Sequence, residues 1–302
     1  MPVKAEGREH FTNVGNQPLF VWEKRSTSGS RQGVILFVHG SVVASLPTFD
    51  LQARSGPPES SIMDWFAARG FDTWCFDHRG HGRSYKGPEI LATIADGADD
   101  ITAVSDYIRA QGSTEPLLIY GQSSGALRAA VFTERHPERV KRLVLDAFVW
   151  TGKDSPTLEQ RQKRLAEWRA SNRRPVDRAF LESIFTRDHP GYAISEWLET
   201  YIEQALAIDN TCPNGTYIDM CANLPLVDPS RLPVPTLIMR GEFDGVGGME
   251  DLLAFFSRLP NGDKEFAVMP GIAHAAFLAK NYRRPREVMH SFFTRSEPAF
   301  CR

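Results

Sequence analysis

Short β-rich runs alternate with helix-length amphipathic stretches along most of this chain of 302 residues, and this alternation constrains the fold more than any other feature. The run at residues 34–39 ends at Gly40 and is typical of a parallel strand buried on both faces. Further strands are expected at residues 71–77, 116–120, 142–146, 234–240 and 265–269, after a hairpin that includes residues 20–23. Helices are expected between them, one opening at Ser61 and ending at Gly70, the others at residues 92–111, 124–136, 249–259 and 285–293. This order predicts an α/β protein with a mostly parallel sheet.

The alternation is interrupted between residues 148 and 233, where no clean strand is expected. Helical segments are expected at residues 157–170, 176–184 and 194–208, together with a loop rich in Asn, Pro and Gly. We therefore predict a core formed by residues 1–147 and 234–302, with residues 148–233 inserted as a helical cap.

The sequence Gly121-Gln122-Ser123-Ser124-Gly125 lies between an expected strand and an expected helix. A chain that turns sharply from strand to helix brings its backbone close to itself, so glycine is favoured on both sides of the central residue. Such a turn presents the Ser123 hydroxyl at the carboxyl end of the sheet. Ser123 is therefore the predicted nucleophile.

A serine nucleophile needs a base, and the base needs an acid that fixes its tautomer. His274 is the predicted base because it follows the expected last strand. Asp244 is the predicted acid because it follows the strand at residues 234–240, while Asp146 and Glu242 are weaker alternatives at similar positions. The oxyanion is expected to bind the backbone N–H of Ser124 and one from Ser41 or Val42, in the turn after the strand at residues 34–39.

Five ordered motifs give the chain a resemblance to the α/β-hydrolase superfamily over essentially its whole length. They are His39-Gly40, the turn Asp77-His78-Arg79-Gly80-His81-Gly82-Arg83-Ser84, Gly121 to Gly125, Gly241 to Asp244, and Gly271 to His274. Within the superfamily the chain resembles the serine esterase and monoacylglycerol-lipase-like branch, whose members carry a helical cap. The resemblance implies an eight-stranded sheet, a catalytic triad, a two-donor oxyanion hole, and neither cofactor nor metal. It also implies that the turn with Arg79 and His81 is structural.

Substrate contacts are expected from His39 and Gln122, which flank the reacting groups, and from Phe148 and Trp150, which begin the insertion. The long stretch between Gly40 and Ser61 has no obvious helix or strand and is expected to form one side of the substrate pocket. A basic run is expected to form a solvated helix face, with attraction of an anionic substrate as the alternative. Its members are Arg161, Lys163, Arg164, Arg169, Arg173 and Arg174.

Composition narrows the classes of partner. A net charge of −2 gives no reason to expect a nucleic-acid partner, and no apolar run is long enough to span a membrane. The polar N-terminus lacks the pattern of a secretory signal, so a cytoplasmic location is expected. The four cysteines, Cys75, Cys212, Cys221 and Cys301, are expected to be reduced thiols.

These features together predict a serine hydrolase that cleaves a carboxylic ester of a small hydrophobic substrate through an acyl-enzyme. The same triad is compatible with a thioesterase, an amidase, a C–C bond hydrolase or an acyltransferase. A receptor that binds a small ligand without turnover is a further alternative. The sequence does not indicate an oligomeric state.

Overall fold

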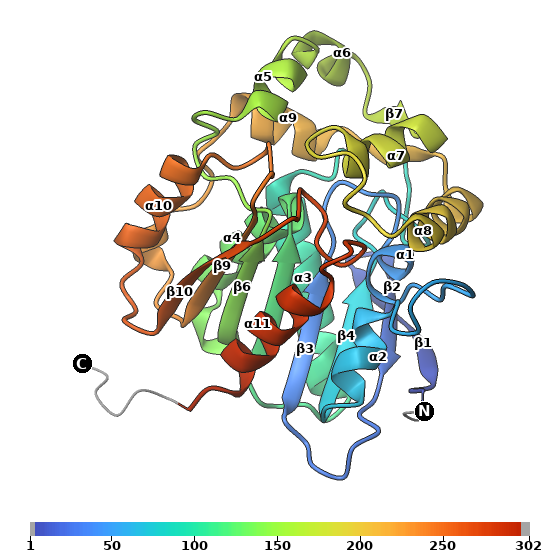
Figure 1. The fold of residues 1–302 in the computed structure, drawn as a ribbon, viewed down its shortest axis with the longest axis vertical. Helices are drawn as coiled ribbons and strands as arrows, with labels where there is room; N and C mark the ends of the chain where they lie inside the picture. Colours follow the sequence, from blue (N-terminus) through green and yellow to red (C-terminus); the bar gives the residue numbers. More distant parts are fainter. Residues whose placement is uncertain (1–3, 297–302) are drawn as a thin grey trace.

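The computed structural model describes residues 4–296, with an eight-stranded sheet at its centre (Figure 1). Its strands are β1 (Gly7–Val14), β2 (Gln17–Lys24), β3 (Gly33–Val38), β4 (Phe71–Phe76), β5 (Leu117–Gln122), β6 (Val140–Asp146), β9 (Thr236–Gly241) and β10 (Lys264–Met269). The spatial order is β1-β2-β4-β3-β5-β6-β9-β10. β2 pairs antiparallel with β1 and β4, and all other neighbours are parallel. The predicted α/β class with a mostly parallel eight-stranded sheet is confirmed.

Helices cover both faces of the sheet because successive side chains of the central strands point to opposite faces. In β3, Ile35 and Phe37 belong to one apolar core, and Leu36 belongs to the other. The first core is closed by α2 (Ile62–Ala67) and α11 (Arg283–Thr294). The second is closed by α3 (Ile94–Ala110), α4 (Ser124–Arg135) and α10 (Met249–Arg258).

A layer of shorter elements from residues 148–233 lies over one end of the sheet (Figure 1). It contains α5 (Pro156–Gln162), α6 (Leu165–Ala170), β7 (Arg173–Pro175), α7 (Arg178–Thr186), α8 (Ser195–Ile208), β8 (Thr211–Pro213) and α9 (Gly215–Ala222). Two 3₁₀ turns, Pro137–Arg139 and Pro229–Arg231, lie outside the helices. We call residues 148–233 the cap; its limits as a separate unit stay a prediction.

The cap departs from the sequence expectation in two places. The helix expected at residues 157–170 is two helices, because the Arg161 carbonyl accepts the Arg164 N–H at 2.9 Å and the Trp168 indole N–H at 3.3 Å. The loop expected to be rich in Asn, Pro and Gly contains α9, whose first residue, Gly215, donates its N–H to the Leu91 carbonyl at 2.8 Å. Only glycine allows the start of α9 to come this close to the Leu91 backbone, because a Cβ at residue 215 would lie 2.3 Å from the Leu91 oxygen.

Other short elements were also missed. The stretch between Gly40 and Ser61 contains the five-residue helix α1 (Ser45–Phe49), which the Asp77 carboxylate anchors by accepting the Ser45 N–H at 2.7 Å. β7 and β8 form a two-stranded antiparallel sheet in a region expected to lack strands. Three-residue strands carry too little periodicity to be predicted.

No helix within residues 4–296 has the length and apolar character needed to cross a membrane. Cys75, Cys212 and Cys221 are buried free thiols, and Cys301 lies outside the described residues.

Candidate active site

Ser123 occupies the sharp turn between β5 and α4, with φ 57° and ψ −124°. Few non-glycine residues adopt a positive φ, and such backbone strain clusters at functional sites. The turn requires glycine on both sides: a Cβ at Gly121 would lie 2.6 Å from the Gly125 carbonyl oxygen, and one at Gly125 would lie 2.4 Å from that of Val38. The two glycines therefore allow α4 to begin directly against the sheet.

The structure brings Ser123, His274 and Asp244 together from three separate loops. The Ser123 hydroxyl lies 3.0 Å from Nε2 of His274, and Nδ1 of the same ring lies 2.9 Å from Oδ1 of Asp244. Both ring nitrogens are used at once if the ring carries its proton on Nδ1, donates it to Asp244, and accepts the Ser123 hydroxyl at Nε2. A hydroxyl, an imidazole and a carboxylate thus form one continuous hydrogen-bonded chain.

The loop that carries Asp244 is held by Arg240, at the end of β9. Its guanidinium donates to the backbone carbonyls of Gly241 at 2.7 Å and Asp244 at 2.9 Å. The Asp244 Oδ1 atom also accepts the Val246 N–H at 2.9 Å. Burial alone would raise the pKa of Asp244, but the charge and hydrogen bond of His274, together with the Val246 N–H and the charge of Arg240, outweigh it and lower that pKa below its ordinary value. Asp244 is therefore an ionised partner for an imidazolium.

The two alternative carboxylates have other partners. Asp146, at the end of β6, accepts the Tyr120 hydroxyl at 2.5 Å, and burial raises its pKa to about 7. Glu242 accepts the Gly271 N–H at 2.8 Å and lies near the surface. Neither carboxylate has a hydrogen bond to His274 among the described residues.

The backbone N–H groups expected to bind the oxyanion, those of Ser41, Val42 and Ser124, have no hydrogen-bond acceptor among residues 4–296. Ser124 is the first residue of α4, and N–H groups at a helix start have no partner within the helix. Ser41 and Val42 line the cavity in front of Ser123. The two loops that carry these N–H groups are also linked by side chains. The Ser41 hydroxyl lies 2.9 Å from the Ser124 hydroxyl and 2.5 Å from the Thr216 hydroxyl. Thr216 belongs to α9, so sequence reasoning, which missed this helix, also missed its contact.

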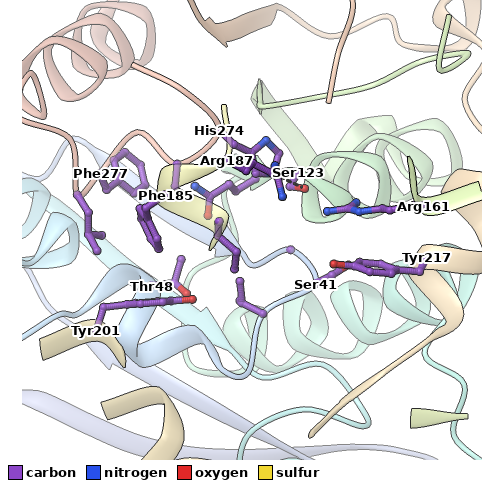
Figure 2. A pocket seen from close by; sticks show the side chains of 16 residues that line it. Ser41, Thr48, Ser123, Arg161, Phe185, Arg187, Tyr201, Tyr217, His274 and Phe277 are labelled. Atoms are coloured by element: carbon purple, nitrogen blue, oxygen red, sulfur yellow. Dashed lines mark hydrogen bonds between the residues drawn. The ribbon is translucent and has the colours of Figure 1, made fainter. Parts of the chain in front are cut away.

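The cavity at Ser123 has two contrasting sides (Figure 2). Phe185, Tyr201 and Phe277 lie on one side of Ser123, and Arg161 and Tyr217 lie on the other. Arg187 and the predicted contact Gln122 also line the cavity. Sequence reasoning did not single out the aromatic residues as pocket residues, because aromatic residues at helical spacing more often pack inside a core.

Three predicted substrate contacts do not line the cavity at Ser123. Phe148 is fully buried against Phe255 with ring centroids 4.8 Å apart, and Trp150 donates its indole N–H to the Val227 carbonyl at 3.0 Å. His39 is also fully buried, and its Nε2 accepts the His78 N–H at 3.1 Å. Phe148 and Trp150 lie away from the cavity because the chain after β6 first runs toward α10, and His39 lies away from it because its ring is buried next to the turn after β4.

The turn after β4 lies away from the cavity, and the basic run is divided between the surface and the cavity. Arg79 donates to Asp100 at 2.5 Å, and His81 is buried, so neither faces the cavity. Lys163 and Arg169 are exposed, as expected for a solvated face, whereas Arg161 lines the cavity and Arg174 is buried beside it.

Comparison with known proteins finds similarity to hydrolases. The family model described as "Serine aminopeptidase, S33" matches residues 58–281. A monoacylglycerol lipase of Mycolicibacterium smegmatis is 22% identical over 281 residues, which cover 91% of this chain and 92% of that protein.

Solved structures give the same fold. A soluble variant of monoglyceride lipase from Saccharomyces cerevisiae, in complex with a substrate analogue, has a TM-score of 0.71 at 17% identity, covering 98% of each chain. E-2-(acetamidomethylene)succinate hydrolase has a TM-score of 0.68 at 19% identity, covering 95% of this chain and 99% of that one. The α/β-hydrolase fold implied by the sequence motifs is confirmed.

Proposed function

The chain belongs to the serine aminopeptidase S33 family of α/β-hydrolases, and we propose that it is a carboxylic ester hydrolase that works through an acyl-enzyme on Ser123. The observation that supports this most is the hydrogen-bonded chain from the Ser123 hydroxyl through His274 to Asp244, next to backbone N–H groups that have no acceptor. Similarity to a monoacylglycerol lipase over 91% of the chain supports an ester as the scissile group.

In the first half of the reaction, Ser123 Oγ attacks the ester carbonyl carbon while its proton moves to Nε2 of His274. The negative charge that forms on the carbonyl oxygen is stabilised by the N–H of Ser124 and by that of Ser41 or Val42. Asp244 stabilises the imidazolium. The C–O bond to the leaving alcohol then breaks, and the alcohol oxygen takes the proton from His274, leaving an acyl ester on Ser123.

The second half repeats these steps with water. His274 accepts a proton from the water whose oxygen attacks the acyl carbon, and the same N–H groups stabilise the second oxyanion. Breaking the bond to Ser123 returns the proton to Oγ and releases the carboxylic acid. The proton that His274 takes from water ends on Ser123 Oγ, so water is the co-substrate and the three triad side chains return to their starting protonation states.

The lining of the cavity supports an ester hydrolase over an aminopeptidase, the activity in the family's description. An aminopeptidase must bind a cationic α-amino group, for which a carboxylate is the natural partner. Among the described residues, none that line the cavity at Ser123 is Asp or Glu, whereas two are arginines. The lining therefore disfavours a substrate with a free amino terminus.

The proposal is tested with 4-nitrophenyl esters of increasing acyl length, acyl-CoA thioesters and aminoacyl 4-nitroanilides. We expect ester turnover that Ser123→Ala lowers by roughly 10⁴-fold or more, and no comparable amide turnover. Ser257→Ala, at an exposed serine of α10, is the matched control and should keep full activity. Turnover of thioesters or amides in preference to esters would replace the proposed function with one of the alternatives.

A further inference from the structure

Three arginines from different cap elements gather around one tyrosine next to the nucleophile. Arg161 comes from α5, Arg174 from β7, and Arg187 follows α7. The guanidinium carbons of Arg161 and Arg174 lie 4.2 Å and 3.8 Å from the ring centroid of Tyr217, in α9. Burial would raise the pKa of Tyr217, but the charges of Arg161, Arg174 and Arg187 outweigh it and lower that pKa. Cations therefore dominate this part of the cap.

The cluster has fewer anionic partners than cations. Arg187 contacts the carboxylate of Asp188 at 3.2 Å. Arg174 donates to backbone carbonyls, those of Pro213 at 2.5 Å and Ser41 at 3.3 Å. The Arg161 guanidinium has neither a hydrogen bond nor a carboxylate partner among residues 4–296, and burial together with the charges of Arg187 and Arg174 lowers its pKa. The Tyr217 ring is its one neighbour of favourable charge in the cluster, and a partly buried guanidinium without a hydrogen-bonded partner gains from binding an anion.

The position of the cluster connects it to the proposed reaction. Arg161, Arg187 and Tyr217 line both the cavity at Ser123 and an adjoining one. The cavity at Ser123 holds only about 50 Å³, whereas the adjoining one holds about 490 Å³ and adds Arg164 and Arg174 to its lining. A substrate larger than the inner cavity can therefore extend past the arginines into the adjoining one.

We propose, on the basis of the ester hydrolase function above, that the substrate carries an anionic group, a carboxylate or a phosphate, which Arg161 and Arg187 bind beside the scissile ester. Guanidinium groups suit this role because their N–H groups match the oxygens of both anions. The apolar part of the substrate lies across Ser123 from Arg161, against Phe185, Tyr201 and Phe277 (Figure 2). Arg174 acts as a positioning residue, since its hydrogen bonds join the cap to the Ser41 backbone.

The test compares esters that carry an anionic group with neutral esters of similar size. On the acyl side, mono-4-nitrophenyl adipate is paired with 4-nitrophenyl hexanoate. On the alcohol side, 4-acetoxybenzoate and 4-acetoxyphenyl phosphate are each paired with methyl 4-acetoxybenzoate, which separates a carboxylate from a phosphate. In at least one pair we expect kcat/KM to be about tenfold or more higher for the anion, mainly through KM, and the preference to fall with ionic strength.

The variants locate the effect. Arg161→Gln should bring the ratio of anionic to neutral kcat/KM close to one, and Arg161→Lys should retain part of the preference. Arg169→Gln, which removes the same charge from an exposed position of α6 outside both cavities, should keep the ratio. A wild-type ratio of one or less in every pair, or a ratio unchanged in Arg161→Gln, would overturn the inference while neutral-ester turnover leaves the proposed function intact.

A binding measurement decides the inference independently of turnover. Of the six tryptophans only Trp168 lines the adjoining cavity, so a fluorescence change that Trp168→Phe removes reports binding there. We expect benzoate to bind more tightly than benzamide, and Arg161→Gln to remove the difference. Equal binding of the two probes by the wild-type protein would contradict the anion site, even if none of the esters is cleaved and the proposed function fails.

Discussion

Asp244 and Asp146 follow neighbouring strands of the sheet, and both are buried, but their surroundings shift their pKa values in opposite directions. His274 stabilises the charged form of Asp244, which lowers its pKa. Asp146 has Tyr120 as its hydrogen-bond partner, and burial with the nearby charge of Asp244 raises its pKa to about 7. One aspartate therefore suits the role of triad acid, and the other suits a protonated structural role.

Replacing each aspartate by asparagine separates these roles. Asp244→Asn should lower kcat for ester hydrolysis by about 10⁴-fold, because an amide cannot stabilise the imidazolium or fix its tautomer. Asp146→Asn should change kcat by less than about tenfold, because it has no contact with the ring. Steady-state kinetics on a 4-nitrophenyl ester measures both. A collapse in Asp146→Asn with a mild effect in Asp244→Asn would assign the acid to Asp146.

The raised pKa of Asp146 also predicts a pH-dependent stability. Its folded pKa of about 7 lies above the ordinary value of 3.8, so its stabilising contribution is fully present below the ordinary value and is lost as the pH rises through about 7. The free energy of unfolding of the wild type, relative to Asp146→Asn, should therefore fall between about pH 4 and pH 8. Urea unfolding at several pH values measures this difference. A constant difference would contradict the assignment.

Among single residues, the sequence predicts best those that come directly after a strand, because the strand fixes where they lie. Ser123, Asp244 and His274 each follow a parallel strand, and the carboxyl ends of such strands share one edge of the sheet. Phe148 and Trp150 lie away from the cavity at Ser123 because their neighbours depend on the path of the chain after β6, which no local pattern encodes. For the same reason Arg187 was missed and Arg161 was assigned mainly to a solvated face.

At the scale of elements, the contact between β3 and α4 determines where Ser123 stands. Gly125 lies at this contact, with the Val38 carbonyl oxygen 2.4 Å from the position a Cβ would take. Neither backbone can move without shifting the start of α4. The nucleophile is thus positioned by close packing of two elements, rather than by hydrogen bonds of its own side chain alone.

Gly125→Ala should therefore lower the free energy of unfolding by about 2 kcal/mol or more and reduce ester hydrolysis sharply, because the overlap must be relieved by moving backbone. Gly262→Ala is the matched control, since nothing lies within 4 Å of a Cβ there, and it should change stability by less than about 0.5 kcal/mol. Denaturant unfolding and ester kinetics on both variants provide the comparison. Wild-type stability and activity in Gly125→Ala would refute this account of the turn.

The sheet elements were predicted well because buried parallel strands are unbroken apolar runs, such as that of β3. The cap was predicted less well because its elements are short and depend on tertiary contacts. The start of α9 is fixed by a hydrogen bond from Gly215 to Leu91, far away in the sequence, and α1 is fixed by Asp77. Such contacts leave no periodic signal.

At the scale of the whole molecule, the candidate site lies where the cap meets the carboxyl edge of the sheet (Figure 1). Both apolar cores continue from the sheet into the cap: Phe37 shares one with Phe185, and Leu145 shares the other with Met220. The sheet supplies the reacting groups and the cap supplies the arginines and most of the aromatic wall. Chemistry and selectivity are thus expected to be separable by mutation.

Covalent labelling with a fluorophosphonate, followed by peptide mass spectrometry and rate measurement, tests the proposed acyl-enzyme most directly. The reagent should attach to Ser123 alone, at a rate that His274→Ala lowers by about 10³-fold or more, because the hydroxyl needs the imidazole to remove its proton. An adduct on another residue, or an equal labelling rate in the wild type and His274→Ala, would contradict nucleophilic attack by Ser123 with His274 as its base.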